Sequence, residues 1–321
     1  MKAIQVKEHG DEQVLQITNL PIPKPGPDEV LIQLKAVGLN FIDIYMRTGY
    51  YPHALPYVPG FEGSGIVREI GSKVSEVKVG DRVAYTGALG SYAEYNVVKA
   101  TQLIPLPDEM SFEEGAAFPL QGMTAQYLVN DFYKIKPNDR VLIHAAAGGV
   151  GLLLVQWVKH LKGIVIGTVS TSEKASIVKK AGGDHLILYT EQDFVEEVMR
   201  ITDGKGVDYI IDGVGKTTFS KDMEAARKYG HICLFGSASG PAEALAPNSL
   251  QAKSLTISGG NLFNCMNTRE EILERARMVL QGIQEKWLRL KIETIFSLDD
   301  AAKAHAMLKG RQTSGKVILK L

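Results

Sequence analysis

The stretch Val141-Leu-Ile-His-Ala-Ala-Ala-Gly-Gly-Val-Gly-Leu-Leu-Leu-Val-Gln-Trp-Val-Lys159 decides the fold of half of this chain. It begins as a buried strand, passes through small residues and continues as an apolar helix. Ala145, Gly148 and Gly151 have the spacing A-x-x-G-x-x-G, and their small side chains let the backbone approach a pyrophosphate. Free N–H groups and the positive end of the helix dipole attract that anion. A tight strand-to-helix turn without a ligand would use the same small residues. We predict a dinucleotide site on Ala147, Gly148, Gly149, Val150 and Gly151.

Strands and helices alternate regularly after Arg140. The apolar runs expected to be strands are residues 141–145, 164–169, 185–188, 207–212, 231–236 and 255–258. Helices are expected between them, as in residues 192–201 and 217–229. This alternation predicts an α/β, Rossmann-like, doubly wound parallel sheet.

The first third of the chain has a different pattern of apolar and polar residues. Short alternating runs, interrupted by glycine and proline, predict a β-rich, partly open barrel that ends in a helical segment over residues 112–127. Near the C-terminus we expect helices at 269–281 and 299–309, and a last strand from Lys316 that returns to the first domain. The predicted domains are residues 1–122, residues 123–263 for the nucleotide, and a C-terminal segment, 264–321.

Composition excludes several classes of protein. Basic and acidic residues balance at 36 each, which argues against a dedicated nucleic-acid or membrane-surface binder. The N-terminal residues lack the apolar stretch of a signal peptide, and no run approaches the roughly 20 apolar residues of a membrane span. Cys233 and Cys265 are the two cysteines, too few for a disulfide framework or a four-cysteine zinc site. We expect a cytoplasmic location.

The end of the second nucleotide-domain strand indicates which dinucleotide binds. Folds that prefer NAD place a carboxylate there for the ribose 2′-hydroxyl, but this strand runs into Ser170-Thr-Ser-Glu-Lys174 with no carboxylate at its tip. A 2′-phosphate would find a hydroxyl at Ser170, an ammonium at Lys174 and a phenol at Tyr189. Alternatively, Ser170 is a helix cap and Lys174 a solvated first-turn residue. We predict NADPH as the cofactor.

At this point the chain resembles the quinone oxidoreductases, the zeta-crystallin-like branch of the medium-chain dehydrogenase/reductase superfamily. The resemblance covers essentially the whole chain and implies that the first domain has a GroES-like fold. The matching residues are Asn40-Phe-Ile-Asp43, Tyr45, Arg47, Gly49, Tyr51-Pro52, Pro59-Gly60, Gly80-Asp-Arg-Val83, Asn138-Asp139, Leu142, Ala146-Ala-Gly-Gly-Val-Gly151, Gln156, Lys159 and Gly315-Lys-Val-Ile-Leu319.

Zinc-dependent relatives carry Gly-His-Glu-x-x-Gly, whose histidine binds catalytic zinc, and a cysteine ligand about twenty residues earlier. This chain reads Gly60-Phe-Glu-Gly-Ser-Gly65, with Asn40 at the cysteine position. Phenylalanine cannot ligate a metal and asparagine cannot replace a thiolate on zinc. We therefore expect no metal. Without zinc, Glu62 is not expected to act as a base.

The resemblance also implies roles for individual residues. Asn40 is expected near the nicotinamide or its ribose, and Tyr45 and Tyr51 are expected to line the substrate site; these three form the predicted catalytic set. On residues alone, Asn40 could instead cap a turn, and either tyrosine could be a packing residue. Further cofactor contacts are expected at Thr124, Gly213, Phe235, Gly236, Ser237, Asn261, Phe263 and Lys316.

The favoured function is NADPH-dependent reduction of a quinone or a related conjugated carbonyl compound. One departure weakens the quinone assignment, since Ser258-Gly-Gly-Asn261 lacks an arginine that some members carry there. Hydride transfer to the β-carbon of an enal or enone is the alternative reaction. A structural or RNA-binding role, known among zeta-crystallin-like relatives, is the alternative of another class. We also expect a homodimer, paired through the apolar run at residues 254–258.

Overall fold

The computed structural model describes residues 1–321 and divides into two compact units. The first unit is Met1–Gly122, Met266–Arg277 and Leu290–Leu321. The second unit is Met123–Cys265 and Met278–Arg289. The segment Met278–Arg289, expected with the first domain, thus belongs to the second unit. Trp287 explains this, because its ring packs on Trp157 and His160, with centroids 5.2 and 4.0 Å away.

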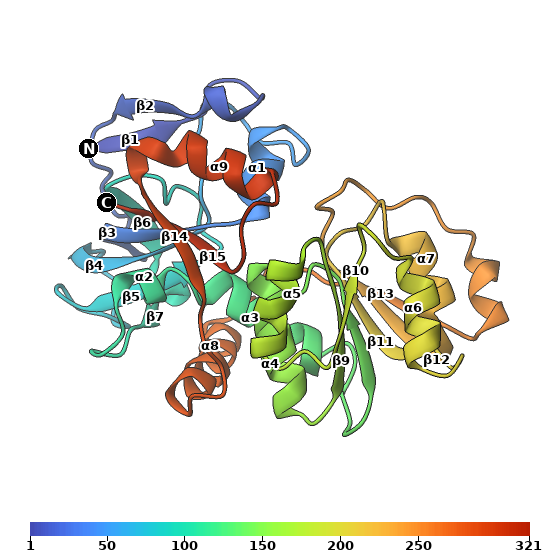
Figure 1. Ribbon diagram of the computed structural model, residues 1–321. Coiled ribbons are helices and arrows are strands. Elements are labelled where there is room, and N and C mark those ends of the chain that lie inside the picture. Colours follow the sequence, from blue (N-terminus) through green and yellow to red (C-terminus); the bar gives the residue numbers. More distant parts are fainter. The chain divides into compact units, whose positions relative to one another are not determined.

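The first unit is built on a seven-stranded sheet in the order β14-β15-β3-β4-β5-β7, with β6 also paired to β3 (Figure 1). Its pairs are antiparallel apart from the parallel pair β14 and β15. The strands of this unit are β1 (Lys2–Gln5), β2 (Gln16–Asn19), β3 (Glu29–Leu39), β4 (Glu62–Ile70), β5 (Arg82–Thr86), β6 (Tyr95–Lys99), β7 (Ile104–Pro105), β14 (Ile292–Ser297) and β15 (Lys316–Lys320). Its helices are α1 (Phe41–Arg47), α2 (Phe112–Gly115) and α9 (Ala301–Lys309), with short 3-10 turns at Glu12–Val14, Ala100–Gln102 and Leu298–Asp300.

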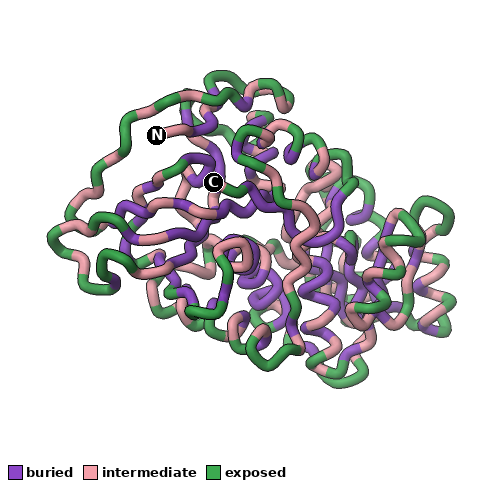
Figure 2. Tube along the Cα trace, turned by 60° about the vertical axis from the view of Figure 1, so that its left-hand side comes forward, coloured by how far each residue is buried: buried purple, intermediate pink, exposed green.

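The long strand β3 organises the core of the first unit. Val30, Ile32 and Leu34 alternate into the core and are at most 2% exposed. Most residues of β3 are buried, and Figure 2 colours buried residues purple along the trace. A Cβ at Gly65 of β4 would lie 2.1 Å from the carbonyl oxygen of Gln33, so only glycine lets β4 approach β3 here.

The second unit is a six-stranded parallel sheet in the order β10-β9-β8-β11-β12-β13, which confirms the predicted doubly wound fold. Its strands are β8 (Arg140–Ile143), β9 (Ile164–Val169), β10 (His185–Leu188), β11 (Val207–Asp212), β12 (Ala226–Leu234) and β13 (Thr256–Gly259). Its helices are α4 (Gly149–His160), α5 (Ser172–Lys180), α6 (Phe194–Ile201) and α7 (Phe219–Ala225), with 3-10 turns at Pro247–Ala252 and Leu262–Cys265. Two helices contain a boundary between the units: α3 (Pro119–Asn130) and α8 (Arg269–Gln284).

Two predicted helices differ from the observed elements, and one observed strand was not predicted. The helix expected over 112–127 is two helices, because Pro119 cannot continue a helix and begins α3 instead. The helix expected over 217–229 ends at Ala225, where β12 begins, and Tyr229 adopts a left-handed φ of 59° that no helix accommodates. Strand β14 was not predicted, because it is an edge strand without a cleanly alternating buried face.

Candidate active site

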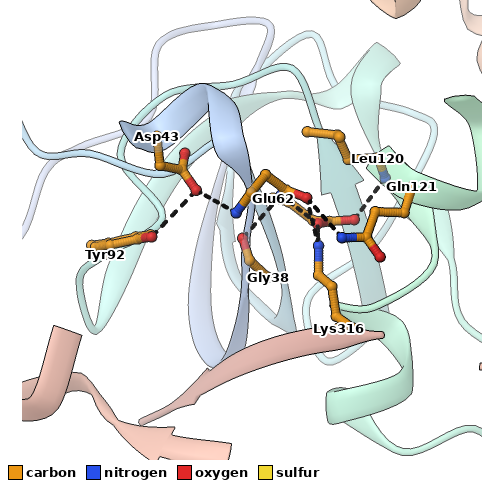
Figure 3. A network of polar contacts seen from close by, with 8 residues as sticks. Gly38, Asp43, Glu62, Tyr92, Leu120, Gln121 and Lys316 are labelled. Carbon is orange, nitrogen blue, oxygen red and sulfur yellow. Dashed lines mark hydrogen bonds and ion pairs between the residues drawn. The ribbon is translucent and has the colours of Figure 1, made fainter. Parts of the chain in front are cut away.

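The first unit contains a buried cluster of three polar side chains from distant parts of the chain. Asn40 precedes α1, Glu62 begins β4 and Lys316 begins β15; each is at most 4% exposed. The ammonium of Lys316 contacts the carboxylate of Glu62 and donates to Asn40 Oδ1 at 2.8 Å. Figure 3 shows the side chains of Glu62 and Lys316 pointing toward each other. The cluster brings together two predicted site residues, Asn40 and Lys316, and adds Glu62.

Each polar atom of Asn40 already has a partner. Its Nδ2 donates to Glu62 Oε2 at 2.9 Å and to the Gly38 carbonyl at 3.2 Å. Its backbone N–H donates to Asp43 Oδ2 at 2.8 Å, which fixes the start of α1. An amide NH₂ has two hydrogens, and both are engaged. The side chain of Asn40 is therefore held in a single orientation.

Glu62 is held at both carboxylate oxygens. The backbone N–H of Leu120 donates to Oε1 at 2.6 Å, and Lys316 and Asn40 share Oε2. Burial lowers the pKa of Lys316, while the charges of Glu62 and Asp43 act in the opposite direction. Both oxygens of the Glu62 carboxylate are thus engaged by donors within the protein.

These residues do not fit a zinc ion. The ammonium of Lys316 lies against Asn40, which stands at the position of the cysteine ligand, and against Glu62, which follows Phe61. A second cation at that place would meet a fixed positive charge and an amide, which is not a zinc ligand set. No group of three or more His, Cys, Asp or Glu side chains gathers as a metal site in the structure.

A second set of buried groups lies behind Asn40. Asp43 Oδ2 accepts from the hydroxyl of Tyr92 at 3.2 Å, and the same hydroxyl lies 2.9 Å from His305 Nε2. Burial raises the pKa of Asp43 to about 7 and lowers the pKa of His305 to about 3. Arg47, also buried, pairs with Glu12 at 3.1 Å. Tyr92 and His305 are 213 residues apart, and nothing in the local sequence of either residue reveals this contact.

Tyr45 and Tyr51 belong to an aromatic cluster that includes a third tyrosine, Tyr50. The ring centroid of Tyr45 lies 5.3 Å from that of Tyr51 and 5.5 Å from that of Tyr50, both edge to face. Tyr50 and Tyr51 stack at 5.2 Å and are 42% and 43% exposed. Burial, and then the neighbouring Tyr50, raise the pKa of Tyr51, so its hydroxyl keeps its proton at neutral pH. Tyr50 was missed, although it adjoins Tyr51 in sequence.

In the second unit, the predicted glycine turn leads into α4 without a side chain capping the helix. Gly148 is the N-cap residue and makes no side-chain cap hydrogen bond. A Cβ at Gly151 would lie 2.4 Å from the carbonyl oxygen of Ala145, so this position requires glycine for the turn itself. Ala147 is buried, whereas Gly148, Gly149 and Val150 are partly exposed. The uncapped helix start leaves N–H donors and the positive end of the dipole for an anion.

Ser170 and Tyr189 directly follow β9 and β10, and Lys174 lies in the first turn of α5. The N–H of Tyr189 donates to the Val169 carbonyl at 3.1 Å, and Thr190 Oγ1 donates to the Ser170 carbonyl at 3.0 Å. The N-cap of α5 is Thr171, whose hydroxyl accepts from the Lys174 N–H at 3.3 Å. Ser170 is therefore not the N-cap of α5, and its hydroxyl does not cap this helix.

The other predicted cofactor residues follow β11, β12 and β13. The Phe235 ring packs on Gly213, where a Cβ would lie 2.7 Å from the ring. The backbone N–H of Ala238 donates to the Gly213 carbonyl at 3.1 Å, which holds Gly236 and Ser237 beside the β11 loop. Asn261 Oδ1 accepts from the Phe263 N–H at 3.0 Å, and Thr124 is buried in α3.

Together these loops lie at the carboxyl ends of the parallel strands. Strand β8 is flanked by β9 and β11, so the chain order reverses beside β8 and the glycine turn follows that strand. In doubly wound sheets, ligands bind at this topological switch point. A sheet of this kind joined to a mainly antiparallel β unit is the architecture of a pyridine-nucleotide oxidoreductase of the medium-chain type.

Comparison with known proteins supports that class. Residues 26–108 match the alcohol dehydrogenase GroES-like domain family, and residues 149–278 match the zinc-binding dehydrogenase family. A quinone oxidoreductase of Pseudomonas aeruginosa is 40% identical, covering 99% of both chains. A 2-haloacrylate reductase of a Burkholderia species is 39% identical, covering 99% of this chain and 98% of the relative. The structure of Escherichia coli quinone oxidoreductase complexed with NADPH superposes with a TM-score of 0.97 at 37% identity, covering all of both chains.

The chain belongs to the zinc-free quinone oxidoreductase branch of the medium-chain dehydrogenase/reductase superfamily. The resemblance stated from the sequence is thereby confirmed, as is the GroES-like fold of the first domain. No helix of the structure has the length and apolar character needed to span a membrane.

Proposed function

We propose that this protein is an NADPH-dependent, zinc-independent reductase of quinones and related conjugated carbonyl compounds. The observation that supports this most strongly is the uncapped start of α4 after the glycine turn, at the switch point of the sheet. Full-length similarity to quinone oxidoreductases, one of them solved with NADPH, supports the same function. The expected substrate is a small molecule.

The cofactor residues follow from the chemistry of each loop. Ala147, Gly148, Gly149, Val150 and Gly151 would hold the pyrophosphate, and Ser170, Lys174 and Tyr189 the 2′-phosphate. Thr124, Gly213, Phe235, Gly236, Ser237, Asn261 and Phe263 would contact the rest of the dinucleotide. From the first unit, Asn40 and Lys316 would contact the cofactor's reactive end. When bound, NADPH supplies the hydride for the reduction.

The contacts of Asn40 refine its proposed role. Both of its N–H hydrogens are already donated, so Asn40 cannot polarise an acceptor oxygen without losing a buried hydrogen bond. The better donor is a tyrosine hydroxyl, and the raised pKa of Tyr51 keeps that hydroxyl protonated. We therefore assign Asn40 to holding the reactive end of the cofactor in place and not to polarising the acceptor, and we assign Tyr45 and Tyr51 to contact with the flat acceptor.

Reduction of a conjugated carbon–carbon double bond is the second candidate. The similarity to a 2-haloacrylate reductase, nearly as high as that to the quinone oxidoreductases, favours it. An activated alkene is also flat and conjugated, so the same aromatic cluster would suit it. The two reactions differ in the acceptor atom and not in the cofactor.

Steady-state oxidation of NADPH against two substrate panels separates these reactions. One panel contains quinones with one to three rings, and the other contains enals, enones and 2-haloacrylates. Higher kcat/KM for the quinones supports the main proposal. Fast alkene reduction with negligible turnover of every quinone would replace it with the second candidate.

A homodimer in the cytoplasm completes the proposal. Strand β13 is the last strand of the parallel sheet, so one edge of its backbone is open to pairing with a second copy. Gel filtration at micromolar concentration should give about twice the chain mass of 35.1 kDa, and a monomer there would contradict the dimer. Neutral charge balance argues against RNA as a main partner, which a salt titration of RNA affinity would test.

A further inference from the structure

A buried cluster of four polar side chains lies beneath the glycine turn, and the roles proposed above do not use it. His144 and Thr168 are 3% and 2% exposed, and Asp212 and Asp222 are fully buried. His144 Nδ1 lies 3.0 Å from Thr168 Oγ1, and His144 Nε2 lies 2.8 Å from Asp222 Oδ1. The ring of Phe194 covers the imidazole edge to face at 4.8 Å.

His144 stands at the start of the nucleotide turn. It follows the last residue of β8 and precedes Ala145, whose φ of 50° turns the chain toward α4. The backbone N–H of His144 donates to the Ile211 carbonyl at 3.2 Å. The backbone N–H of Ala146 donates to the Thr168 carbonyl at 3.0 Å. The imidazole thus links the ends of β8 and β9 to helix α7, which carries Asp222.

Asp212 connects this cluster to the second cofactor loop. Its Oδ1 accepts from the N–H groups of Val214 and Gly215 at 2.6 and 3.2 Å, and its Oδ2 accepts from the hydroxyl of Thr218 at 2.8 Å. The loop that starts at Gly213 is therefore shaped around the Asp212 carboxylate. Any change in the charge of Asp212 would loosen the hydrogen bonds that hold this loop.

The charges within the cluster depend on one another. Burial raises the pKa of Asp222, His144 lowers it and the neighbouring Asp212 raises it, with a net rise to about 6. Burial disfavours a charged His144, but Asp222 and then Asp212 outweigh that effect, so the net shift of its pKa is upward. A protonated His144 places one positive charge beside the buried carboxyl groups of Asp222 and Asp212.

We propose that His144 and Asp222 are positioning residues for the cofactor: Asp222 holds the His144 imidazole, whose positive charge offsets the buried carboxyl groups, and together they keep the glycine turn and the Gly213 loop in their binding geometry. This inference rests on the proposed use of those loops by NADPH. Neither residue needs to touch the cofactor. Their effect should appear in NADPH affinity and in KM for NADPH, with kcat for bound substrates much less affected.

The test uses His144→Gln, because glutamine can still donate to Asp222 but carries no charge. The dissociation constant for NADPH is measured by fluorescence titration from pH 6 to 8.5, always as a ratio to the unaltered protein. With two carboxylates left unbalanced, H144Q should bind NADPH roughly tenfold more weakly at pH 8. The loss should shrink toward pH 6, because burial raises the pKa of Asp222 to about 6 and the Asp222 carboxyl then takes up a proton.

The double variant H144Q/D222N removes one carboxylate together with the positive charge. It should restore affinity to within about threefold and abolish the added pH dependence, which a lost packing contact could not do. His185→Asn, on the exposed part of β10, is the matched control and should change nothing. Thermal unfolding of each variant checks folding, and if H144Q does not fold, H144Q/D222N compared with D222N supplies the measurement.

The outcomes separate this inference from the proposed function. NADPH binding by H144Q that equals that of the unaltered protein at all pH values would overturn this inference alone. A loss that is the same at every pH, and that H144Q/D222N does not relieve, would also overturn it. Failure of the unaltered protein to bind NADPH would overturn the proposed function and this inference with it.

Discussion

Lys316 Nζ donates to Asn40 Oδ1 at 2.8 Å, joining the last strand of the chain to the residue that begins the first helix. Both partners also contact Glu62, so one buried ammonium, one amide and one carboxylate form a closed set. In zinc-dependent relatives, metal ligands occupy the positions of Asn40 and Phe61. In this chain the ammonium of Lys316 pairs with Glu62, so the positive charge beside Glu62 belongs to a side chain and not to a metal ion.

Removal of that ammonium should destabilise the fold. Lys316→Met leaves the Glu62 carboxylate buried without a cation, which costs about 3–5 kcal/mol in the free energy of unfolding. The double variant K316M/E62Q should recover most of the loss, because no uncompensated charge remains. Urea denaturation measures each value. The control is Lys320→Met on the same strand, whose exposed pair with Glu113 contributes about 1 kcal/mol or less. Equal losses in K316M and K316M/E62Q would contradict the charge argument.

Asp43 and His305 should give opposite pH dependences of stability. The pKa of Asp43 rises from 3.8 to about 7 on folding, so its contribution to stability is lost as pH rises through that range. The pKa of His305 falls from 6.5 to about 3, so its contribution is lost as pH falls through that range. Relative to the unaltered protein, His305→Gln should therefore gain stability as pH falls below 6.5, and Asp43→Asn should gain stability as pH rises toward 7.

Denaturant titrations between pH 4 and 8 provide the measurement for both variants. The difference from the unaltered protein is compared at each pH, which removes the contribution of surface groups that titrate in the same range. Differences that do not vary with pH would show that neither group titrates as inferred.

Lys174 should set the preference for NADPH. Lys174→Ala removes the ammonium proposed to meet the 2′-phosphate and should lower kcat/KM for NADPH by roughly tenfold or more, while leaving kcat/KM for NADH within about twofold. Lys180→Ala, at the exposed far end of α5, is the matched control. A parallel decrease for both cofactors would indicate damage to α5 instead of a lost phosphate contact.

The tyrosine cluster should act through ring stacking as well as through a hydroxyl. Tyr51→Phe keeps the stack on Tyr50 and loses the donor, so it should lower kcat more than it raises KM for the quinone. Tyr51→Ala loses both, and KM should also rise roughly 3- to 10-fold. Tyr229→Ala, which removes an exposed ring outside the cluster, is the control. Unchanged kinetics in Y51A would remove Tyr51 from the substrate site.

Much of the second unit could be predicted because its signals are local. The glycine turn, the apolar strand before it and the helix after it are contiguous in sequence, and the strand–helix alternation requires the parallel sheet. The cofactor, the family and the absence of the zinc-ligand residues also follow from short motifs around Asn40, Phe61 and Ser170. The predicted helices over 112–127 and 217–229 were wrong where the local pattern is ambiguous, at Pro119 and at Tyr229.

The sequence by itself determined the doubly wound sheet, the dinucleotide turn and the family, because these depend on residues that are neighbours along the chain. Only the tertiary structure decided which buried charged and polar side chains pair with one another. Lys316 and Glu62 are 254 residues apart, and His144 and Asp222 are 78 apart. Periodicity and spacing encode which face of a strand or helix is buried, whereas the pairing of buried charges depends on how separate elements pack.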